Sequence, residues 1–516
     1  MRITNKVMQN NSLTNINTNK LLQDKLSTQM ATEKKVNRPS DDPVVAIRAL
    51  RLRTNVNQIT QYYEKNVPDA ESWLKLTEDA ISSMTEVITD MYENATKGSN
   101  ENLTLDDKRT ILTQLKSLRD EVYSTGNTDY AGRYIFTGYR TDSTLTFTTD
   151  ETKTYSITEQ LDSSMLDTIT HVKTGDLLDI NEANFAGTNV EENDIASNQI
   201  HRLRLSYQNV GDAAPVIKYN EYDAAAGTYT PTDITCDVVS LYDTTNPYEN
   251  VDPDKAYLIK ETGEILLGEN VYKKLMDTSD DPATVANEKE IQVTYEKSDW
   301  KKGDLKPEHY FACSEKRVAP LTDIQYNQSY LAGTQERQAI EYDVGLNQRI
   351  RVNTTADEIF THDIGRDVDD MIASLEESIA IEEMVAKLGD LLKDTANIND
   401  PAKKDQLEKQ LAAANKALTF SNEKTQKLFE GSITKMQGHL DTVNLASTQN
   451  GTRSQRLELI SNRLMSQKTN FETLQSENED ADIAEVAIKL NSAGLTYNAS
   501  LMATGKILQN SLMDFI

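Results

Sequence analysis

The stretch NRPSDDPVVAIRALRLR at residues 37–53 places two prolines around two aspartates, directly before an apolar, helix-favouring run. Pro39 lacks a backbone donor and disfavours helix at the residue before it, which predicts that a helix arriving from the N-terminal side stops at Arg38. Asp42 is suited to cap the next helix, because its carboxylate can accept from free N–H groups of the first turn. Pro43 falls at the first helical position, where a missing N–H costs nothing. PSDDP therefore predicts a helix stop, a cap and a restart, although these residues alone are equally typical of a plain interhelical turn.

Amphipathic helices are predicted on both sides of this break and again at the C-terminal end. Before the break an apolar residue recurs every four positions, as Leu22, Leu26 and Met30. Residues 45–63, 73–91 and 111–122 carry single apolar stripes at spacings of three and four, which is typical of helices in a narrow bundle. Further helices are predicted at 375–392 and at 457–474, where the apolar residues keep heptad spacing. The last helix has the most regular stripe, formed by Ala487, Leu490, Gly494, Tyr497, Leu501, Thr504, Leu508, Ser511 and Phe515, with Ile483, Leu512 and Ile516 beside it.

Gly, Thr and Ser occupy several positions of the stripe in the last helix, which makes it a weak coiled coil on its own. Such a helix is marginal in isolation and gains its stability from neighbours. Two interpretations remain open. The ends of the chain become ordered only on assembly, or they form an ordinary antiparallel hairpin inside a monomer.

Between about residues 135 and 360 the stripes give way to short alternating runs rich in Gly, Pro, Thr, Tyr and Asp. AYLIKETGEILLG at 256–268 predicts a β-hairpin that turns at Glu261–Glu264. Further strands are predicted at 290–296, 309–315 and 348–355. The span is too long for one loop, so we expect one or two β-rich domains. The predicted fold class is α+β, with long terminal helices forming a coiled coil or helical bundle around a central β-rich insertion.

Composition excludes several classes of function. The chain has 82 Asp and Glu against 54 Lys and Arg, a formal net charge of −28, so binding to nucleic acid or anionic lipid is not expected. No window reaches the length and apolarity needed for membrane insertion, and the first residues lack the apolar core of a secretory signal. Composition alone would therefore predict a cytoplasmic protein. Cys236 and Cys313 are the only cysteines, which excludes a disulfide framework and a CxxC metal site.

Motifs that carry chemistry are missing from the sequence. The five histidines include no HExxH pair, and no P-loop, GxGxxG, GxSxG or EF-hand loop occurs. DVDD at 367–370 is interpreted as negative charge in the first turn of a helix, and ENEDADIAE at 477–485 as a charged joint before the last helix. No catalytic residue, metal site or cofactor is predicted, and an enzyme is not expected.

Three segments resemble a known family. The start MRITNKVM, the break at 37–53 and the run DYAGRYIFTGYRTDSTLTF at 129–147 are similar to hook–filament junction proteins, the hook-associated protein 3 family of the flagellin superfamily. NGTRSQRLELISNRL at 450–464 and the last 37 residues, 480–516, resemble the returning helices of that superfamily. The resemblance covers about residues 1–147 and 345–516, and the central span is larger than is usual in the family.

The resemblance implies an architecture. The terminal helices at 1–42 and 478–516 would pair and form the inner tube of a flagellum, disordered in the monomer. The helices of 43–140 and 345–477 would form a surrounding bundle, and 141–344 would project as the central β-rich outer part. The expected hinge between terminal and bundle helices is Pro39, Ser40, Asp41, Asp42 and Pro43. The expected subunit-interaction residues are Leu22, Leu26, Met30, Leu490, Tyr497, Leu501, Leu508, Leu512 and Phe515.

The resemblance also implies a role and partners. Copies of the chain would form a ring that joins the proximal hook-associated junction protein to the flagellin filament. A flagellar export chaperone would be a further partner, and nucleic acid and membrane insertion are not expected. The chain would be secreted through the flagellar type III channel without a cleaved signal peptide, which overrides the cytoplasmic prediction.

Two alternatives stay open. INTN at 16–19 is a flagellin-like feature, so the chain could be a filament subunit, which copy number per flagellum would test. The Tyr-rich region around 207–330 could instead make the central part a surface adhesin or glycan-binding module. Binding of the isolated 141–345 fragment to glycans or host cells would support that alternative.

Overall fold

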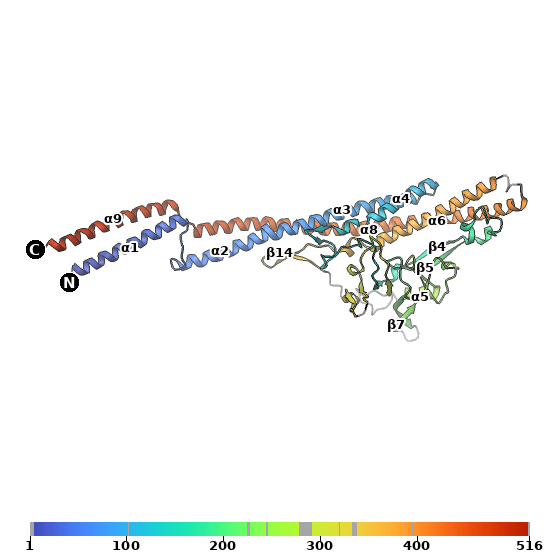
Figure 1. Ribbon diagram of the computed structural model, residues 1–516, viewed down its shortest axis with the longest axis horizontal. Helices are drawn as coiled ribbons and strands as arrows, with labels where there is room; N and C mark the ends of the chain where they lie inside the picture. The colour runs from blue at the N-terminus through green and yellow to red at the C-terminus, as the bar shows by residue number, and fades with distance from the viewer. Residues whose placement is uncertain are drawn as a thin grey trace. The chain divides into compact units, whose positions relative to one another are not determined.

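The computed structural model describes residues 5–513 except 102, 224–227, 244–245, 278–290, 319, 333–337, 395–396 and 398. The chain divides into two compact units. Unit 1 comprises Met1–Glu71, Tyr342–Ile350 and Gln455–Ile516, and unit 2 comprises Ser72–Glu341 and Arg351–Ser454. Long helices begin and end the chain and the strands lie between them in sequence, which confirms the predicted α+β class (Figure 1).

Unit 1 is built mainly from helices at the two ends of the chain. Helix α1 (Asn5–Thr32) runs beside α9 (Ile483–Met513), and α2 (Pro43–Gln61) follows the break (Figure 1). A π-helical turn, Tyr62–Asn66, leads from α2 into α3 (Val67–Gly98), and α8 (Pro401–Glu479) ends at the joint with α9. The hairpin of β14 (Glu341–Gly345) and β15 (Gln348–Arg351) is anchored in unit 1 where Asn66 donates to the Asp343 carbonyl at 2.7 Å.

The helices of unit 2 are α3, α4 (Leu105–Glu121), α6 (His362–Lys393) and the first part of α8. Thr104 and Asp107 form a capping box at the start of α4. Helix α4 packs on α6, where the buried Lys108 ammonium donates to Ser378, Glu382 and Asn422 at 2.7–2.9 Å. The hydrogen bonds to oxygens of all three partners allow this lysine to stay buried.

The β region of unit 2 contains two larger sheets. One has five strands in the order β4-β5-β10-β9-β8 and the other six in the order β13-β12-β3-β11-β6-β7, with every pairing antiparallel except β8 with β9. The first sheet comprises β4 (Leu166–Lys173), β5 (Ala196–Arg204), β8 (Asp237–Val239), β9 (Ala256–Ile259) and β10 (Glu264–Leu267). The second comprises β3 (Tyr155–Leu161), β6 (Val216–Asp223), β7 (Thr228–Thr235), β11 (Ile291–Lys297), β12 (Ala312–Glu315) and β13 (Ile324–Tyr326). The predicted hairpin at 256–268 is confirmed as β9 and β10.

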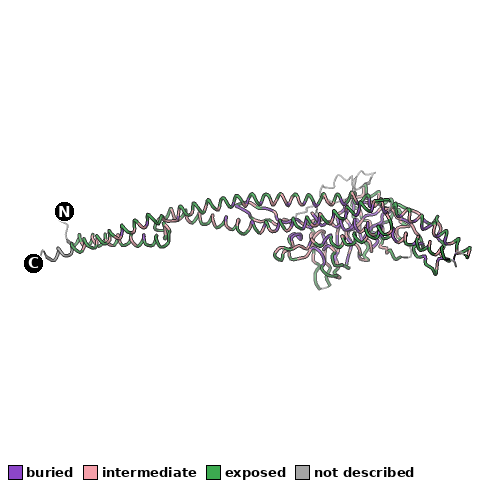
Figure 2. The backbone as a smooth tube through the Cα atoms, turned by 90° about the horizontal axis from the view of Figure 1, so that it is seen from above, coloured by how far each residue is buried: buried purple, intermediate pink, exposed green. Residues whose placement is uncertain are grey.

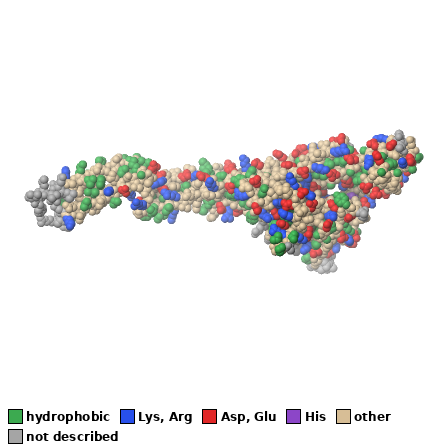
Figure 3. Space-filling model, viewed as in Figure 1, with side chains coloured by type: hydrophobic (Ala, Val, Ile, Leu, Met, Phe, Trp, Pro, Cys, Tyr) green, Lys and Arg blue, Asp and Glu red, His purple; other side chains and the backbone are tan. Residues whose placement is uncertain are grey.

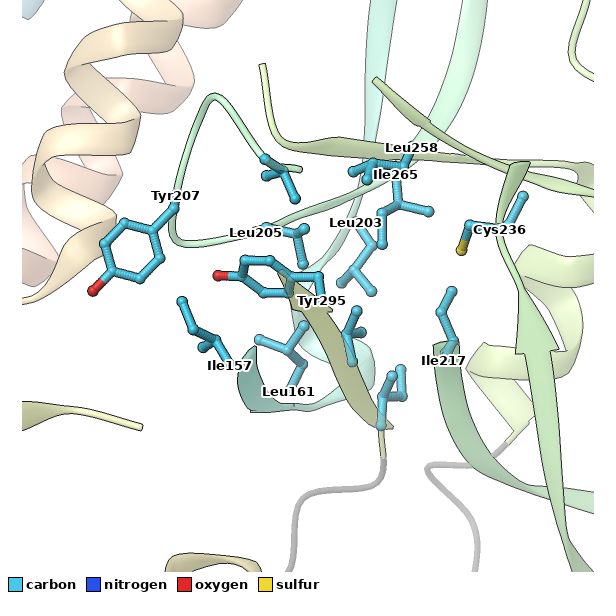
Figure 4. Packing of buried hydrophobic residues seen from close by; sticks show 14 of the residues in the cluster. Ile157, Leu161, Leu203, Leu205, Tyr207, Ile217, Cys236, Leu258, Ile265 and Tyr295 are labelled. Carbon is cyan, nitrogen blue, oxygen red and sulfur yellow. The ribbon is translucent and has the colours of Figure 1, made fainter. Parts of the chain in front are cut away.

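Both sheets contribute to one apolar core. Leu203 and Ile265 from the first sheet and Ile157 and Ile217 from the second are fully buried in the same cluster (Figure 4). The alternation of buried and half-buried residues along β3 and β11 directs every second side chain into this cluster. Cys236 and Cys313 are buried free thiols, and burial raises the pKa of Cys236 to about 12, so both behave as small apolar residues.

The prediction that DVDD at 367–370 lies in the first turn of a helix is wrong, because α6 begins at His362. Asp367 and Asp370 are held by arginines of β5: Arg204 donates to Asp367 at 2.7 Å and to Asp370 at 2.8 Å, and Arg202 pairs with Asp370 at 2.5 Å. Burial alone would raise the pKa of Asp367, but the hydrogen bond from His439 and the charge of Arg204 hold it well below its usual range. Because β5 is far away in sequence, the spacing of the aspartates could not reveal these partners.

A buried carboxyl group inside the sandwich makes the stability of unit 2 depend on pH. Glu159 on β3 is 0 % exposed; it accepts from the Tyr295 hydroxyl and from the Ser206 amide at 3.1 Å. Burial raises the pKa of Glu159 from 4.5 to about 7, against the opposing effect of these hydrogen bonds. In the native state the group therefore keeps its proton at pH values where the unfolded chain has lost it.

Over pH 4.5 to 7 we expect the free energy of unfolding of the wild type to drop by up to about 3 kcal/mol relative to that of the Glu159→Gln variant, because the variant lacks the contribution of Glu159. The largely buried His171, His309 and His362, whose pKa values burial lowers, act in the opposite direction but equally in both proteins, so the difference between the two profiles reports Glu159. Urea unfolding followed across that pH range would measure it. The exposed Glu182→Gln variant is the control and should keep the wild-type pH profile. Equal pH profiles for wild type and Glu159→Gln would contradict the prediction.

Candidate assembly site: the terminal helix pair and its joint

The joint of unit 1 consists of two paired segments: one directly follows α1, and the other connects α8 to α9. Helix α1 ends at Thr32, six residues before the predicted stop at Arg38, so that prediction is wrong. Glu33 adopts a left-handed backbone with φ of 59°, and the following segment pairs with the segment between α8 and α9. The Lys35 amide donates to the Glu479 carbonyl at 2.7 Å, and the Ala481 amide to the Glu33 carbonyl at 2.8 Å. Pairing with residues distant in sequence therefore ends the helix before the proline can.

The PSDDP segment itself forms a turn and a cap. The Asp41 amide donates to the Arg38 carbonyl at 2.9 Å, which closes a turn with Pro39 at its second position. Asp42 caps α2, because its carboxylate accepts from the amides of Val44 and Val45 at 3.0 and 3.1 Å. Pro43 is the first helical residue. The predicted cap and restart are confirmed, and the turn orients α2 with few freely rotating bonds.

A buried carboxylate fastens the joint. Glu479, the last residue of α8, is 4 % exposed and forms a two-point ion pair with Arg53 of α2, at 2.7 Å to Nε and 2.5 Å to Nη2. The hydrogen bond and the charge of Glu479 raise the pKa of Arg53. Beside it, the hydrogen bonds from Lys34 and Ser476 lower the pKa of Asp480. Bidentate arginine pairing fixes direction as well as distance, so the end of α8 and α2 are held in register.

Inside the terminal pair, a narrow set of small and apolar residues joins α1 to α9. Leu26 is 6 % exposed and packs against Val486 and Ala493, with Ala481 and Leu490 at the edge of this cluster. Further along, Asn19 donates to the Ser500 hydroxyl at 2.9 Å. The cluster is small for two helices of about thirty residues, because Ser, Thr and Ala occupy much of the contact line. The pair therefore has only modest stability of its own.

The outer surface of the pair carries apolar side chains without partners among the described residues of the chain. On α9, Ile488, Leu495 and Met502 recur every seven residues and are 70–73 % exposed. On α1, Leu21 is 70 % exposed and Leu13 is 56 % exposed. Figures 2 and 3 show this part of the chain as mainly exposed, with hydrophobic side chains spread over its surface. We call Ile488, Leu495 and Met502 the outer ridge of α9.

An open groove runs along the same helix pair. It has a volume of about 710 Å³ and is lined by Leu22, Leu26 and Val486 together with charged side chains such as Lys25 and Glu485. A second hollow of about 240 Å³ continues it past Leu22 towards Thr496. The lining combines apolar side chains with charged ones of both signs, which suits the two faces of an amphipathic helix.

The structure places the predicted interaction residues in three settings. Leu26 is buried between α1 and α9, and Leu490 and Tyr497 are half-buried on the side of α9 that faces α1. Leu22, Met30 and Leu501 are 40–48 % exposed. The side chains of Leu508 and Leu512, and Phe515 altogether, lie outside the described residues.

The outer ridge is absent from the interaction residues predicted from the sequence. At 100° per residue, the stripe chosen from the sequence runs along the flank of the face that contacts α1, and the outer ridge lies on the opposite side. The signal was available, because Ile488, Leu495 and Met502 are large apolar residues at heptad spacing. It was hidden because α9 is apolar over more than half of its circumference.

Among the described residues, no group of three or more His, Cys, Asp or Glu is arranged to hold a metal ion. Nor does any described helix combine the length and apolarity needed to cross a membrane.

Comparison with known proteins agrees with this arrangement. Residues 3–141 match the family model described as the bacterial flagellin N-terminal helical region. The first part of this chain is thus similar to the helical region of bacterial flagellins. The matched segment contains α1, α2, α3 and α4, so the PSDDP break at residues 39–43 lies within it.

Curated relatives refine the comparison. The chain is 34 % identical over 144 residues to flagellar hook-associated protein 3 of Salmonella typhimurium, covering 28 % of this chain and 45 % of that protein. It is 34 % identical over 181 residues to the protein of the same name from Escherichia coli, covering 34 % and 56 %. A flagellin of Clostridium tyrobutyricum is 27 % identical over 128 residues, covering 25 % and 34 %. The resemblance to hook-associated protein 3 is confirmed, and the chain spans about half the length of the two relatives of that name.

Proposed function

We propose that this protein is a structural adaptor of the bacterial flagellum that joins the hook to the flagellin filament. The similarity to two proteins named hook-associated protein 3 supports this role, as does the flagellin-type N-terminal region. The role requires repeated contacts between copies and asks for no catalytic residue.

The observation that carries the proposal is the outer ridge of α9. Ile488, Leu495 and Met502 are about 70 % exposed, so the helix pair leaves apolar surface in contact with water. Burial of this surface against another copy would stabilise the contact between the copies. In the proposed ring, the ridge of one copy lies against the terminal helices of the next, and the groove beside Leu22 receives a neighbouring helix. The contact is head-to-tail, which closes into a ring when the rotation between copies closes.

The partners follow from the same role. The proximal hook-associated protein lies on one side of the ring and flagellin on the other. The chain reaches this place through the flagellar export channel, assisted by an export chaperone and without a cleaved signal peptide. The modest contact between α1 and α9 supports this route, because a terminal pair of low stability costs little to unfold before export.

Deleting the gene tests the proposal. Cells without this protein are expected to keep their hooks and to release unpolymerised flagellin into the medium, because the filament lacks its attachment. Electron microscopy of the hooks and the amount of flagellin in the medium measure the result. Normal filaments and normal swimming in the deletion strain would contradict the proposed role.

A flagellin filament subunit is the second candidate, favoured by the flagellin of Clostridium tyrobutyricum among the relatives. The copy number per flagellum separates the two roles. A filament subunit has to be the most abundant protein of the purified flagellum, whereas a junction ring contains few copies. Quantitative mass spectrometry of purified flagella decides between them.

A further inference from the structure

A polar cavity of about 150 Å³ lies inside unit 2, where two loops of the β-sandwich meet the first turns of α6 and the end of α4. The loops are residues 206–209, after β5, and residues 297–305, from the end of β11. One water molecule needs only about 10–15 Å³ of such space. The cavity therefore has room for a small ion with part of its hydration shell.

Two buried cations line this cavity. Lys297 is 2 % exposed, and its Nζ donates to two backbone carbonyl oxygens, at 2.6 and 3.4 Å. Arg366 is 4 % exposed and also donates to two backbone carbonyl oxygens, at 3.1 and 2.6 Å. Burial lowers the pKa of both groups. Carbonyl oxygens satisfy the donors, but they carry no full negative charge to balance the two cations.

The carboxylates at the cavity leave this charge unbalanced. Asp369 is paired with Arg119, whose Nε lies 2.8 Å from its Oδ1, and it stays 3.9 Å from Arg366. Asp304 lies 3.9 Å from the Lys297 ammonium, beyond hydrogen-bond distance. With Arg119 and Asp369 counted as a neutral pair, the lining offers Lys297 and Arg366 one further carboxylate, that of Asp304. Asp370 and Glu264 also act on Arg366, but they are paired with Arg202 and Arg204. Lys301 adds no further unbalanced positive charge, since the Asp299 carboxylate lies 3.1 Å from its Nζ.

His362, the first residue of α6, adds a polar atom without a partner. It is 9 % exposed and lines the cavity, and its Nε2 has no hydrogen-bond partner among the described residues. Burial lowers the pKa of His362 to about 3, so the imidazole is neutral and can carry its proton on Nε2. A buried donor left unsatisfied is costly, and the positive end of α6 lies at the same wall.

We propose that this cavity binds a small oxyanion, of the class of inorganic phosphate and sulfate, between Lys297, Arg366 and His362. The anion supplies the negative charge that the cavity lacks and accepts the proton of the His362 imidazole. It also connects both sandwich loops with the first turns of α6, so its binding stabilises unit 2. The inference is independent of the flagellar role.

Thermal unfolding and calorimetric titration of the full-length protein with inorganic phosphate, and separately with sulfate, test the site. Chloride at matched ionic strength is the reference. We expect a saturable rise in melting temperature with either oxyanion and none with chloride. Lys297→Met removes one charge-assisted hydrogen bond and should weaken binding about tenfold or more.

His362→Phe is the gentler variant. It keeps a ring between Tyr207 and Tyr310, whose centroids lie 4.8 and 4.6 Å away, and removes only the ring nitrogens. It should also weaken oxyanion binding, while the melting temperature without ligand stays at least as high as that of the wild type, because the unpartnered donor is removed. Lys316→Met is the matched control, because Lys316 is a part-exposed lysine paired with Glu296 on the same sheet.

Two outcomes would overturn the proposal. One is that the wild-type protein shows no saturable binding of phosphate or sulfate at millimolar concentrations, in which case the cavity holds water only. The other is that the folded His362→Phe variant binds as tightly as the control Lys316→Met, which would place the oxyanion elsewhere. If Lys297→Met does not fold, His362→Phe decides the question alone.

Discussion

Replacing Ile488 and Leu495 by aspartate should reduce retention of the protein on purified hooks by about 100-fold or more and leave the hooks without filaments. Each of these side chains loses roughly 1.5–3 kcal/mol of burial in the proposed ring, and each new carboxylate adds a desolvation cost. Because the contact recurs in every copy, the loss recurs around the ring. The free protein should fold normally, since both residues are about 70 % exposed in it.

The measurement compares mutant protein in the medium with mutant protein retained on hooks. Export is expected to continue, because the proposed export route carries the chain unfolded and does not use the contact that these substitutions remove. Asn491→Asp with Asn498→Asp is the matched control: it adds the same two charges, seven residues apart, at exposed polar positions of α9. Wild-type retention of the ridge variant on hooks, with filaments attached, would show that the outer ridge is no assembly surface.

Replacing Leu26 by aspartate should open the α1–α9 pair already in the free protein. Leu26 is the largest side chain buried in the small cluster with Val486 and Ala493. A carboxylate there has no cationic partner inside the cluster, and Leu→Ala alone at a buried position costs about 2–5 kcal/mol. The amides of both helices should therefore lose their protection from hydrogen exchange together, since each helix has marginal stability without the other.

Hydrogen exchange and limited proteolysis of the free protein follow this opening. Amides of α1 and α9 should exchange faster in Leu26→Asp, while the β-sandwich of unit 2 keeps its protection. Leu22→Asp is the control one turn away, since Leu22 is 48 % exposed and should change little. If the terminal helices of the wild type were already as unprotected as those of Leu26→Asp, the pair would form only on assembly.

Local chemistry accounts for the features that could be predicted from the sequence. The cap at Asp42, the first helical position of Pro43, the capping box of Thr104 and Asp107 and the β9–β10 hairpin all depend on residues within a few positions of one another. Helical and strand periodicity likewise reports which side of an element is apolar. The resemblance to hook-associated protein 3 came from such local segments at the two ends of the chain.

Contacts between distant residues explain what could not be predicted. Helix α1 ends at Thr32 because Glu33 and Lys35 pair with the segment after α8, more than 440 residues later. Asp367 and Asp370 are buried against arginines of β5, so their role was assigned wrongly from their place near a helix start.

The terminal helices show which features depend on the local sequence and which depend on contacts between distant residues. The sequence by itself determined that α9 is amphipathic and too polar in places to be stable alone. Only the tertiary structure decided which side of α9 contacts α1 and which is left outside, because α9 is apolar around much of its circumference and its rotation depends on packing. Side-chain fit between Leu26, Val486 and Ala493 sets that rotation, and Ile488, Leu495 and Met502 consequently face outward.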